Sequence, residues 1–382
     1  MRLGVWMPFE RVPDVLAFFM GVTVSAETVR RLTEEAGAAQ VAVETARVEA
    51  LEADPPAARC GPAVQHLSVD GAMVPLVRGE WAAVKTLAIG EVIRRPTGAV
   101  QTTALSYFSR LSDAQQFTRW ARLETERRGT ETAGVVCAVG DGAEWLQHFV
   151  DHHRPDAVRI LDFPHAAQRV CAAAQAVWGA GTAATSSWLD DQLHRLKHGD
   201  PTVVLAALRA LPVAAAPSPA AAAMTRDTAL LYLTARWEQI QYARFRAAGY
   251  PIGSGIVESA NKLVVEGRLK GGGMHWARAN VTPMVALRAM ACSDRWAEVW
   301  PAIWQAWCAR RQAWRVQRAA AHRDTRAAPG AVIPACPPLP APAAPPPVPR
   351  PRLVVDGHPT ANHPWRKRFL PPRPTTTMPA NP

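Results

Sequence analysis

The chain has 382 residues and a formal net charge of +11 at neutral pH, so it is long enough for a buried core and for two or three domains. It has no apolar run of the roughly 18 residues that a membrane span needs, no secretory signal pattern, and no Cys-x-x-Cys pair among its six scattered cysteines. These features argue against a membrane protein, a zinc site or a disulfide framework, and they favour a reducing cytoplasm. The basic charge favours a polyanionic partner such as nucleic acid, with a merely solvated basic surface as the alternative.

The first segment, residues 1–58, has a helical pattern that breaks at Gly21. Ser25 then provides a good N-cap for a second helix. A helix, a glycine-containing turn and a capped helix outline a helix-turn-helix, in which Arg30 and Arg31 could reach DNA. An ordinary helical hairpin is the alternative.

Residues 62–165 change to the period of strands. The expected strands are 64–74, 84–93, 103–111, 133–139 and 157–163, with helices at 113–128 and 144–152. Three strands before the first helix favour an antiparallel meander, and the later helical crossovers favour parallel strands. We therefore expect an α/β fold with a mixed sheet and flanking helices.

Helices alone are expected after the fifth strand, in a helical insertion that spans residues 166–250. Its expected helices are 166–178, 186–196, 203–211 and a long one at 224–248. Residues 251–320 should add a helix that starts at Ser254 and a last helix whose tryptophans share one face as a packing seam. The segment 327–382 is rich in proline, carries six basic residues against one acidic residue, and is expected to be disordered.

Three carboxylates stand in short local signatures. Asp70 and Asp141 follow apolar strands and precede glycine, and Glu258 lies at the start of a late helix. Carboxylates at strand ends are well placed to bind ligands, although Asp-Gly is also the commonest sign of a tight turn. Glu258 has two alternative roles, namely an ion pair with Lys262 and a favourable interaction with the helix dipole.

Carboxylate oxygens are the ligands that Mg²⁺ prefers. Two ions about 4 Å apart can activate an attacking water and stabilise a leaving 3′ oxygen. We therefore expect Asp70, Asp141 and Glu258 to hold two Mg²⁺ or Mn²⁺ ions for phosphodiester chemistry. The separations of 71 and 117 residues between these acids are not specific as numbers.

Two smaller clusters could assist this site. His165 follows Asp162 at a strand-to-helix junction and could donate to a phosphate or to Asp162, or simply cap the helix. A second cluster follows the Glu258 helix and comprises Lys270, a glycine triplet, His275 and Arg278; its basic residues and Lys262 on that helix are expected to bind DNA. A glycine-rich basic turn lets backbone N–H groups approach phosphates, whereas a flexible helix terminator is the alternative.

Several longer phrases resemble bacterial insertion-sequence transposases of the Kra type, which belong to the wider Mutator-like group. These phrases are Ser68–Val74, Lys85–Val92, Gly140–Trp145, Ile160–Ala167 and Tyr250–Lys262, and the similarity runs from about Leu3 to Trp300. The resemblance implies an RNase H-like fold with an all-helical insertion before the helix that carries the third acid.

The resemblance also implies that Asp70, Asp141 and Glu258 are the metal-binding triad of a DDE transposase. Asp162 and His165 match the Asp-x-x-His signature of the wider group, in which the histidine is thought to contact DNA near the cleavage site. The implied reaction is hydrolysis at the transposon ends, followed by attack of the freed 3′-hydroxyl on target DNA. The implied partners are both DNAs and a second copy of the chain, in a dimer or higher oligomer near the nucleoid.

One departure from the family leaves alternatives open. Relatives usually carry a longer region before the segment that begins at Leu3, so part of the end-binding domain could be absent here. A truncated DNA-binding remnant without activity and a host nuclease of the same fold are the two alternatives to an active transposase.

Overall fold

The computed structural model describes residues 1–327, 354–355 and 358–359 of the chain. The chain divides into two units, Met1–Arg318 and Ala319–Pro382. In the second unit, the structure describes the end of a helix and a short antiparallel pair, β6 (Val354–Val355) with β7 (His358–Pro359). The expected disorder of the proline-rich tail falls largely outside the described residues.

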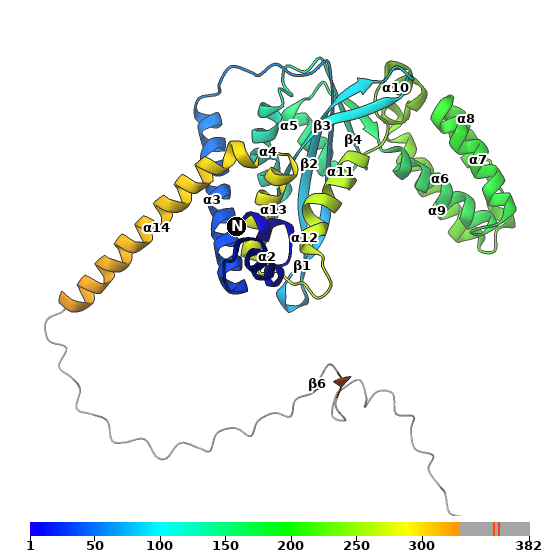
Figure 1. Cartoon of the computed structure of the whole chain (residues 1–382). Helices are drawn as coiled ribbons and strands as arrows, with labels where there is room; N and C mark the ends of the chain where they lie inside the picture. Colours follow the sequence, from blue (N-terminus) through cyan, green and yellow to red (C-terminus); the bar gives the residue numbers. More distant parts are fainter. Residues whose placement is uncertain (328–353, 356–357, 360–382) are drawn as a thin grey trace, which may run out of the picture. The chain divides into compact units, whose positions relative to one another are not determined.

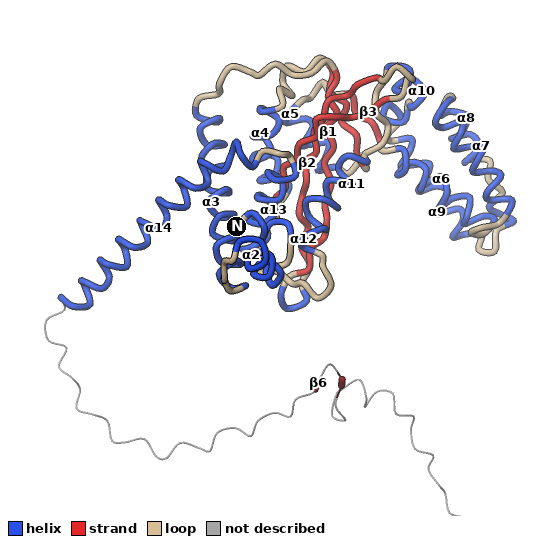
Figure 2. The backbone as a smooth tube through the Cα atoms, in the orientation of Figure 1, coloured by secondary structure: helices blue, strands red, loops and turns tan. Residues whose placement is uncertain are grey.

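A five-stranded mixed sheet lies at the centre of the first unit, in the order β3-β2-β1-β4-β5 (Figures 1 and 2). The strands are β1 (Val64–Pro75), β2 (Trp81–Arg94), β3 (Val100–Arg110), β4 (Val135–Gly140) and β5 (Val158–Leu161). The first three form an antiparallel meander, and β4 and β5 run parallel to β1. The predicted α/β class and the strand directions are therefore confirmed.

Alternation along β1 assigns its side chains to the two faces of the sheet. Leu67 and Val69 pack in one core cluster with Phe117 of α4 (Ala114–Arg127) and Phe149 of α5 (Glu144–His153). Helix α4 begins where the sequence predicts, because the Asp113 carboxylate accepts a hydrogen bond from the Gln116 N–H at 2.7 Å.

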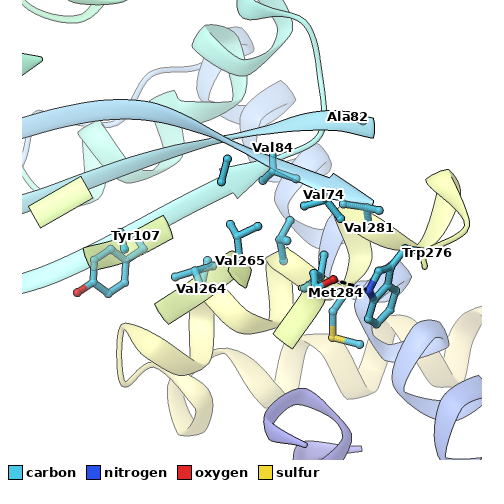
Figure 3. Packing of buried hydrophobic residues seen from close by; sticks show 14 of the residues in the cluster. Val74, Ala82, Val84, Tyr107, Val264, Val265, Trp276, Val281 and Met284 are labelled. Atoms are coloured by element: carbon cyan, nitrogen blue, oxygen red, sulfur yellow. Dashed lines mark hydrogen bonds between the residues drawn. The ribbon is translucent and has the colours of Figure 1, made fainter. Parts of the chain in front are cut away.

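The opposite face of the sheet is covered by a late helical run. It comprises α11 (Gly255–Ala260), the π-helical turn η5 (Asn261–Glu266), α12 (Gly267–Leu269) and α13 (Arg278–Cys292). Figure 3 shows Val74 and Val84 of the sheet in one cluster with Val264 of η5 and Met284 of α13. The sequence predicts neither α13 nor the π-helical turn.

A buried arginine holds the π-helical turn to α13. The Arg288 guanidinium is 3% exposed and donates to the carbonyls of Leu263 and Val264. These contacts satisfy backbone carbonyls inside η5, where the regular α-helical hydrogen-bond pattern is interrupted. Arg288 also donates to the Val5 carbonyl at 3.1 Å, which ties the N-terminal helices to the same point.

The N-terminal helices pack against α13. They are α1 (Arg2–Trp6), the short η1 (Phe9–Arg11), α2 (Val12–Met20) and α3 (Ala26–Ala53). Gly21 ends α2 in the left-handed conformation, and Ser25 accepts a hydrogen bond from the Thr28 N–H at 3.1 Å, as its role as an N-cap predicts. Helix α3 runs unbroken for 28 residues, and its Gly37 lies against Pro283 of α13.

The insertion after β5 is entirely helical, as expected. It contains α6 (Phe163–Trp178), α7 (Ala183–His198), α8 (Pro201–Arg209), η3 (Val213–Ala215), α9 (Pro219–Thr234), η4 (Trp237–Ile240) and α10 (Tyr242–Ala248). The prediction of one long helix at 224–248 is wrong. Arg236 donates to the Gly142 carbonyl at 2.8 Å and the Tyr242 hydroxyl donates to the Leu161 carbonyl at 2.9 Å, and these bonds hold the chain in a bend against the ends of β4 and β5.

The last helix, α14 (Trp296–Ala327), begins in the first unit. Trp296, Trp300 and Trp307 pack on a small cluster around Ile303 and α3, as a packing seam predicts. Trp304 and Trp314 are 46% and 56% exposed, so the seam prediction is wrong for these two positions. None of the helices in the described part of the chain combines the length and the apolar character needed to cross a bilayer.

Candidate active site

Asp70 lies inside β1 rather than in a turn at its end. It pairs with Thr86 of β2, because β1 continues beside β2 to Pro75 after its pairing with β4 has stopped at Leu67. The strand predicted at 64–74 is therefore confirmed, whereas the expectation that Asp70 follows an apolar strand at its end is wrong. Its side chain nevertheless lies at the edge where the parallel part of the sheet ends, which is where parallel strands present ligand-binding groups.

Asp141 follows the last residue of β4 and lies near Asp70. The two carboxylates interact electrostatically: burial raises the pKa of Asp70 above its ordinary value, and the negative charge of Asp141 raises it further. The pKa of Asp70 is lowered in turn by a hydrogen bond from the Gly71 N–H, by His165 and by a hydrogen bond from Asn261. Two like charges at one sheet edge create local negative potential that a cation would relieve.

The loop after Asp141 is held in one shape by several contacts. The carboxylate accepts a hydrogen bond from the Ala143 N–H at 2.9 Å, and the Asp141 carbonyl accepts one from the Tyr232 hydroxyl at 2.5 Å. Gly142 has a φ of 77°, and a Cβ atom there would collide with Arg236. Sequence reasoning missed Tyr232 and Arg236, since neither belongs to a recognisable local signature.

Glu258 lies on the exposed side of α11, where its carboxylate accepts a hydrogen bond from Ser254 Oγ at 3.2 Å. In the described residues it forms no ion pair with Lys262, the alternative that the sequence left open. Ser254 precedes α11, but its side chain accepts no bond from a helix N–H. The expected side-chain cap is therefore absent; the Ser254 backbone (φ −81°, ψ 11°) lacks the extended conformation of a capping residue, and its hydroxyl donates to Glu258.

Asp162 is fully buried and joins three segments of the site. Its Oδ1 accepts a hydrogen bond from the Ser254 N–H at 2.7 Å, and its Oδ2 accepts from the His165 N–H at 3.2 Å and from His165 Nδ1 at 2.7 Å. This carboxylate thus ties the end of β5 and the start of α6 to the start of α11. The His165 side chain is 41% exposed, so the ring is oriented by Asp162 and is still open to solvent.

Asn261 links the Glu258 helix to the sheet. It is 5% exposed, and its Nδ2 donates to Asp70 Oδ2 at 2.9 Å. Because Asn261 follows Glu258 by three positions, the two residues lie near the same face of the helix, one turn apart. The contact brings the helix that carries Glu258 to the sheet edge that carries Asp70. Asn261 lies inside the Tyr250–Lys262 phrase, but no local signal in the sequence indicates its role.

The chemistry of the donors fits a hard divalent cation. Asp70 and Asp141 supply carboxylate oxygens at one edge, and Glu258 lies on the helix that Asn261 fastens there. Within residues that the structure describes, no group of three or more His, Cys, Asp or Glu side chains is already arranged to hold a metal ion. The structure thus brings Asp70 and Asp141 together, whereas Glu258 lies on the neighbouring helix and makes no contact with either acid in the described residues.

Three of the basic residues expected to bind DNA are held by neighbours on their own helices. Arg30 pairs with Glu27 at 2.6 Å, Arg31 pairs with Glu35 at 3.0 Å, and Lys270 pairs with Glu266 at 2.7 Å. Such exposed pairs contribute about 0–1 kcal/mol, so a phosphate can replace the carboxylate partner at little cost.

The other expected contacts with DNA are exposed. Lys262 and Arg278 form no ion pair within the described residues. His275 lines a pocket of about 330 Å³ together with Arg30 and the buried Arg268. The structure therefore brings His275 and Arg30, which are far apart in the sequence, to one place.

Comparison with known proteins adds no family to this description. No protein-family model matches the chain, and no curated protein matches it.

Proposed function

We propose that the chain is a DDE-type DNA transposase whose sheet and covering helices form an RNase H-like catalytic core. One observation carries this proposal: two acids from separate strands, Asp70 and Asp141, meet at the edge where the parallel strands end, beside the helix that carries Glu258. The helical insertion before that helix and the basic charge of the chain also support it.

In this proposal Asp70, Asp141 and Glu258 hold Mg²⁺ or Mn²⁺. When bound, such ions supply an activated water for hydrolysis and stabilise the leaving 3′ oxygen. Asn261 orients the Asp70 carboxylate through its hydrogen bond, and Ser254 does the same for Glu258.

His165 has a separate role in the proposal. Its Nδ1 bonds to the buried Asp162, so Nε2 is the ring nitrogen left to meet a DNA phosphate near the cleaved bond. Hydrolysis at the transposon ends and attack of the freed 3′-hydroxyl on target DNA would use the same site, in a dimer that processes two ends together.

The experiment that tests the proposal is a nicking assay. The DNA that flanks the gene should carry terminal inverted repeats, and the purified chain should nick these ends with Mg²⁺ or Mn²⁺ and not with EDTA. Asp141→Asn should reduce nicking by more than about 100-fold, because even groups that only support metal ligands are worth about 10- to 100-fold. Circular dichroism and a thermal melt should show that this variant is folded.

The matched control is Asp190→Asn, which changes an exposed aspartate on α7 that forms no ion pair within the described part of the chain. It should nick like the unmodified chain. Undiminished nicking by Asp141→Asn would refute the proposal. Cleavage without preference for the ends would indicate a nuclease instead, and binding to the ends without any nicking would indicate an inactive remnant.

A further inference from the structure

The second half of α14, from Trp307 to Arg318, carries an alternating stripe of tryptophan and arginine. Trp307, Arg311, Trp314 and Arg318 are spaced by four, three and four residues, which places them on one face of the helix. Two i,i+4 contacts build the stripe: the Arg311 guanidinium lies 4.8 Å from the centre of the Trp307 ring, and that of Arg318 lies 5.2 Å from the centre of the Trp314 ring. The stripe therefore presents ordered, stacked guanidinium groups.

These arginines have no carboxylate partners. The segment from Val299 to Arg318 contains four arginines and no acidic residue. Among the described residues, no ion pair engages Arg310, Arg311, Arg315 or Arg318. This part of the molecule differs from α3, where Arg30 and Arg31 are both paired. The segment is thus a concentration of positive charge that nothing on the described surface neutralises.

A groove between α3 and α14 extends the charged surface. It has a volume of about 440 Å³ and is lined by Arg31 and Glu35 of α3 and by Trp307, Arg310, Arg311 and Trp314 of α14. Glu35 is occupied, because it pairs with Arg31 and accepts a hydrogen bond from Trp307 Nε1 at 3.0 Å. The groove therefore has aromatic walls and an arginine rim.

We propose that this groove and the exposed face of α14 from Trp307 to Arg318 bind the phosphate backbone of DNA. Guanidinium groups match phosphate oxygens in charge and in fork-like geometry. The tryptophan rings hold the long arginine side chains in place. These side chains therefore lose less conformational entropy when they bind a phosphate. The inference rests on the proposed function, since the partner is the DNA on which the site of Asp70 and Asp141 would act.

Charge favours DNA over the two other possible occupants of this face, which are a second copy of the chain and the segment from residue 327 onward. A second copy that packed on this face by two-fold symmetry would bring an identical row of four arginines against the first, and like charges across an interface are unfavourable. The segment from residue 327 onward is itself basic, with six positive residues and one negative residue, so it offers no charge complement. A polyanion complements the face without these conflicts.

The decisive experiment compares two variants that lose the same charge. One combines Arg310→Gln, Arg315→Gln and Arg318→Gln, which are exposed positions without a carboxylate partner among the described residues. The control combines Arg47→Gln, Arg78→Gln and Arg209→Gln, which are exposed arginines on other elements. Binding of a fluorescein-labelled duplex of mixed sequence is measured by anisotropy in EDTA over a series of salt concentrations.

Each duplex phosphate contact contributes about 0.9 to the slope of log affinity against log salt. The α14 variant should therefore lose about two to three units of slope and bind at least roughly tenfold more weakly at low salt. The control variant should lose clearly less on both measures. Equal losses for the two variants, or no binding by the unmodified chain, would overturn the proposal.

A second comparison tests the tryptophans and the rival partner. Trp314→Ala should weaken binding, whereas Trp81→Ala, at an equally exposed tryptophan on β2, should not. Light scattering of the α14 variant should show an unchanged mass, and a shift to a smaller mass with unchanged DNA binding would assign the face to a second copy instead. Because binding is measured in EDTA, its loss is independent of nicking. Asp141→Asn should still bind through α14 even if the proposed reaction proves wrong.

Discussion

Asp141 occupies the position in the extension of β4 that corresponds to Asp70 in β1. Each paired residue of β1 faces the β4 residue 71 positions later, from Val64 with Val135 to Leu67 with Ala138. Asp70 and Asp141 keep the same separation, three residues beyond the last pair. The separation of 71 residues between the two acids is not a signature by itself. It equals the offset at which the parallel strands β1 and β4 pair.

Asn261→Ala should loosen the site by removing the amide that donates to Asp70. Losing a buried hydrogen bond and leaving a carboxylate oxygen without its donor should lower the free energy of unfolding by about 1–3 kcal/mol. Under the proposed function, nicking should fall by about 10- to 100-fold. Urea denaturation and the nicking assay measure the two effects. Ser259→Ala, an exposed change on the same helix, should alter neither, and equal behaviour of the two variants would show that the contact is unimportant.

Asp162→Asn should destabilise the junction of β5, α6 and α11. Both oxygens of the buried carboxylate accept N–H donors from Ser254 and His165, and an amide would place an NH₂ group against one of them. A loss of at least about 2 kcal/mol in the free energy of unfolding is expected. The comparison is Asp227→Asn, whose exposed pair with Arg226 is worth at most about 1 kcal/mol. A similar small loss for both variants would contradict the role given to Asp162.

Gly142→Ala should distort the loop after Asp141. The residue has a left-handed φ of 77°, and the new methyl group would also collide with Arg236. Gly98→Ala separates the two causes, because Gly98 has a φ of 81° and open space around it. We expect a loss of about 1 kcal/mol for Gly98→Ala and clearly more for Gly142→Ala, measured by chemical denaturation. Equal losses would mean that Arg236 moves away freely.

Folding stability should fall in mild acid because of buried histidines. Burial lowers the pKa of His153 to about 3, and the ring is held in a neutral form between Thr125 and the Thr118 carbonyl. The unfolded chain takes up a proton at this residue below its ordinary pKa of about 6.5, and the folded chain does not. Above about pH 6.5, His153 therefore makes its full contribution to the free energy of unfolding. Between about pH 6.5 and pH 3 this contribution falls by about 1.4 kcal/mol per pH unit.

His66 behaves in the same direction, since burial lowers its pKa to about 3 as well. Urea denaturation of the unmodified chain and of His153→Gln between pH 7 and pH 5 measures the difference. The variant should show a shallower dependence on pH. An identical slope for the two proteins would show that His153 is protonated in the folded state.

Much of the fold could be predicted because its signals are local. The meander and the parallel strands follow from hydrophobic period and from the helices between them, and Asp113 starts α4 because its carboxylate caps the backbone. The bend between α9 and α10 could not be predicted, because its cause lies in carbonyls of Gly142 and Leu161 that are distant in the sequence. Helix α13 was missed because residues from Met284 to Met290 are buried all round, so the segment has no amphipathic period.

Local motifs in the sequence single out the three acids, but no local signal points to the residues that hold them. Asp70, Asp141 and Glu258 stand in recognisable motifs, but the strand around Asp70 continues because β2 pairs with it, against the turn signal of Asp70-Gly71. Ser254 follows the rule for a helix start and yet turns its hydroxyl to Glu258. Both differences arise from tertiary contacts, which override local preference.

The π-helical turn constrains insertions and deletions in this gene. An α-helix advances about 100° per residue, so removing one residue between Asn261 and Glu266 would restore regular winding and rotate Glu258 against Leu269 by about that angle. Leu269 is fixed in the core, so the rotation would swing Glu258 and Asn261 away from the sheet. Under the proposed function, a variant that lacks one residue between Asn261 and Glu266 should therefore lose nicking even though it keeps all three acids.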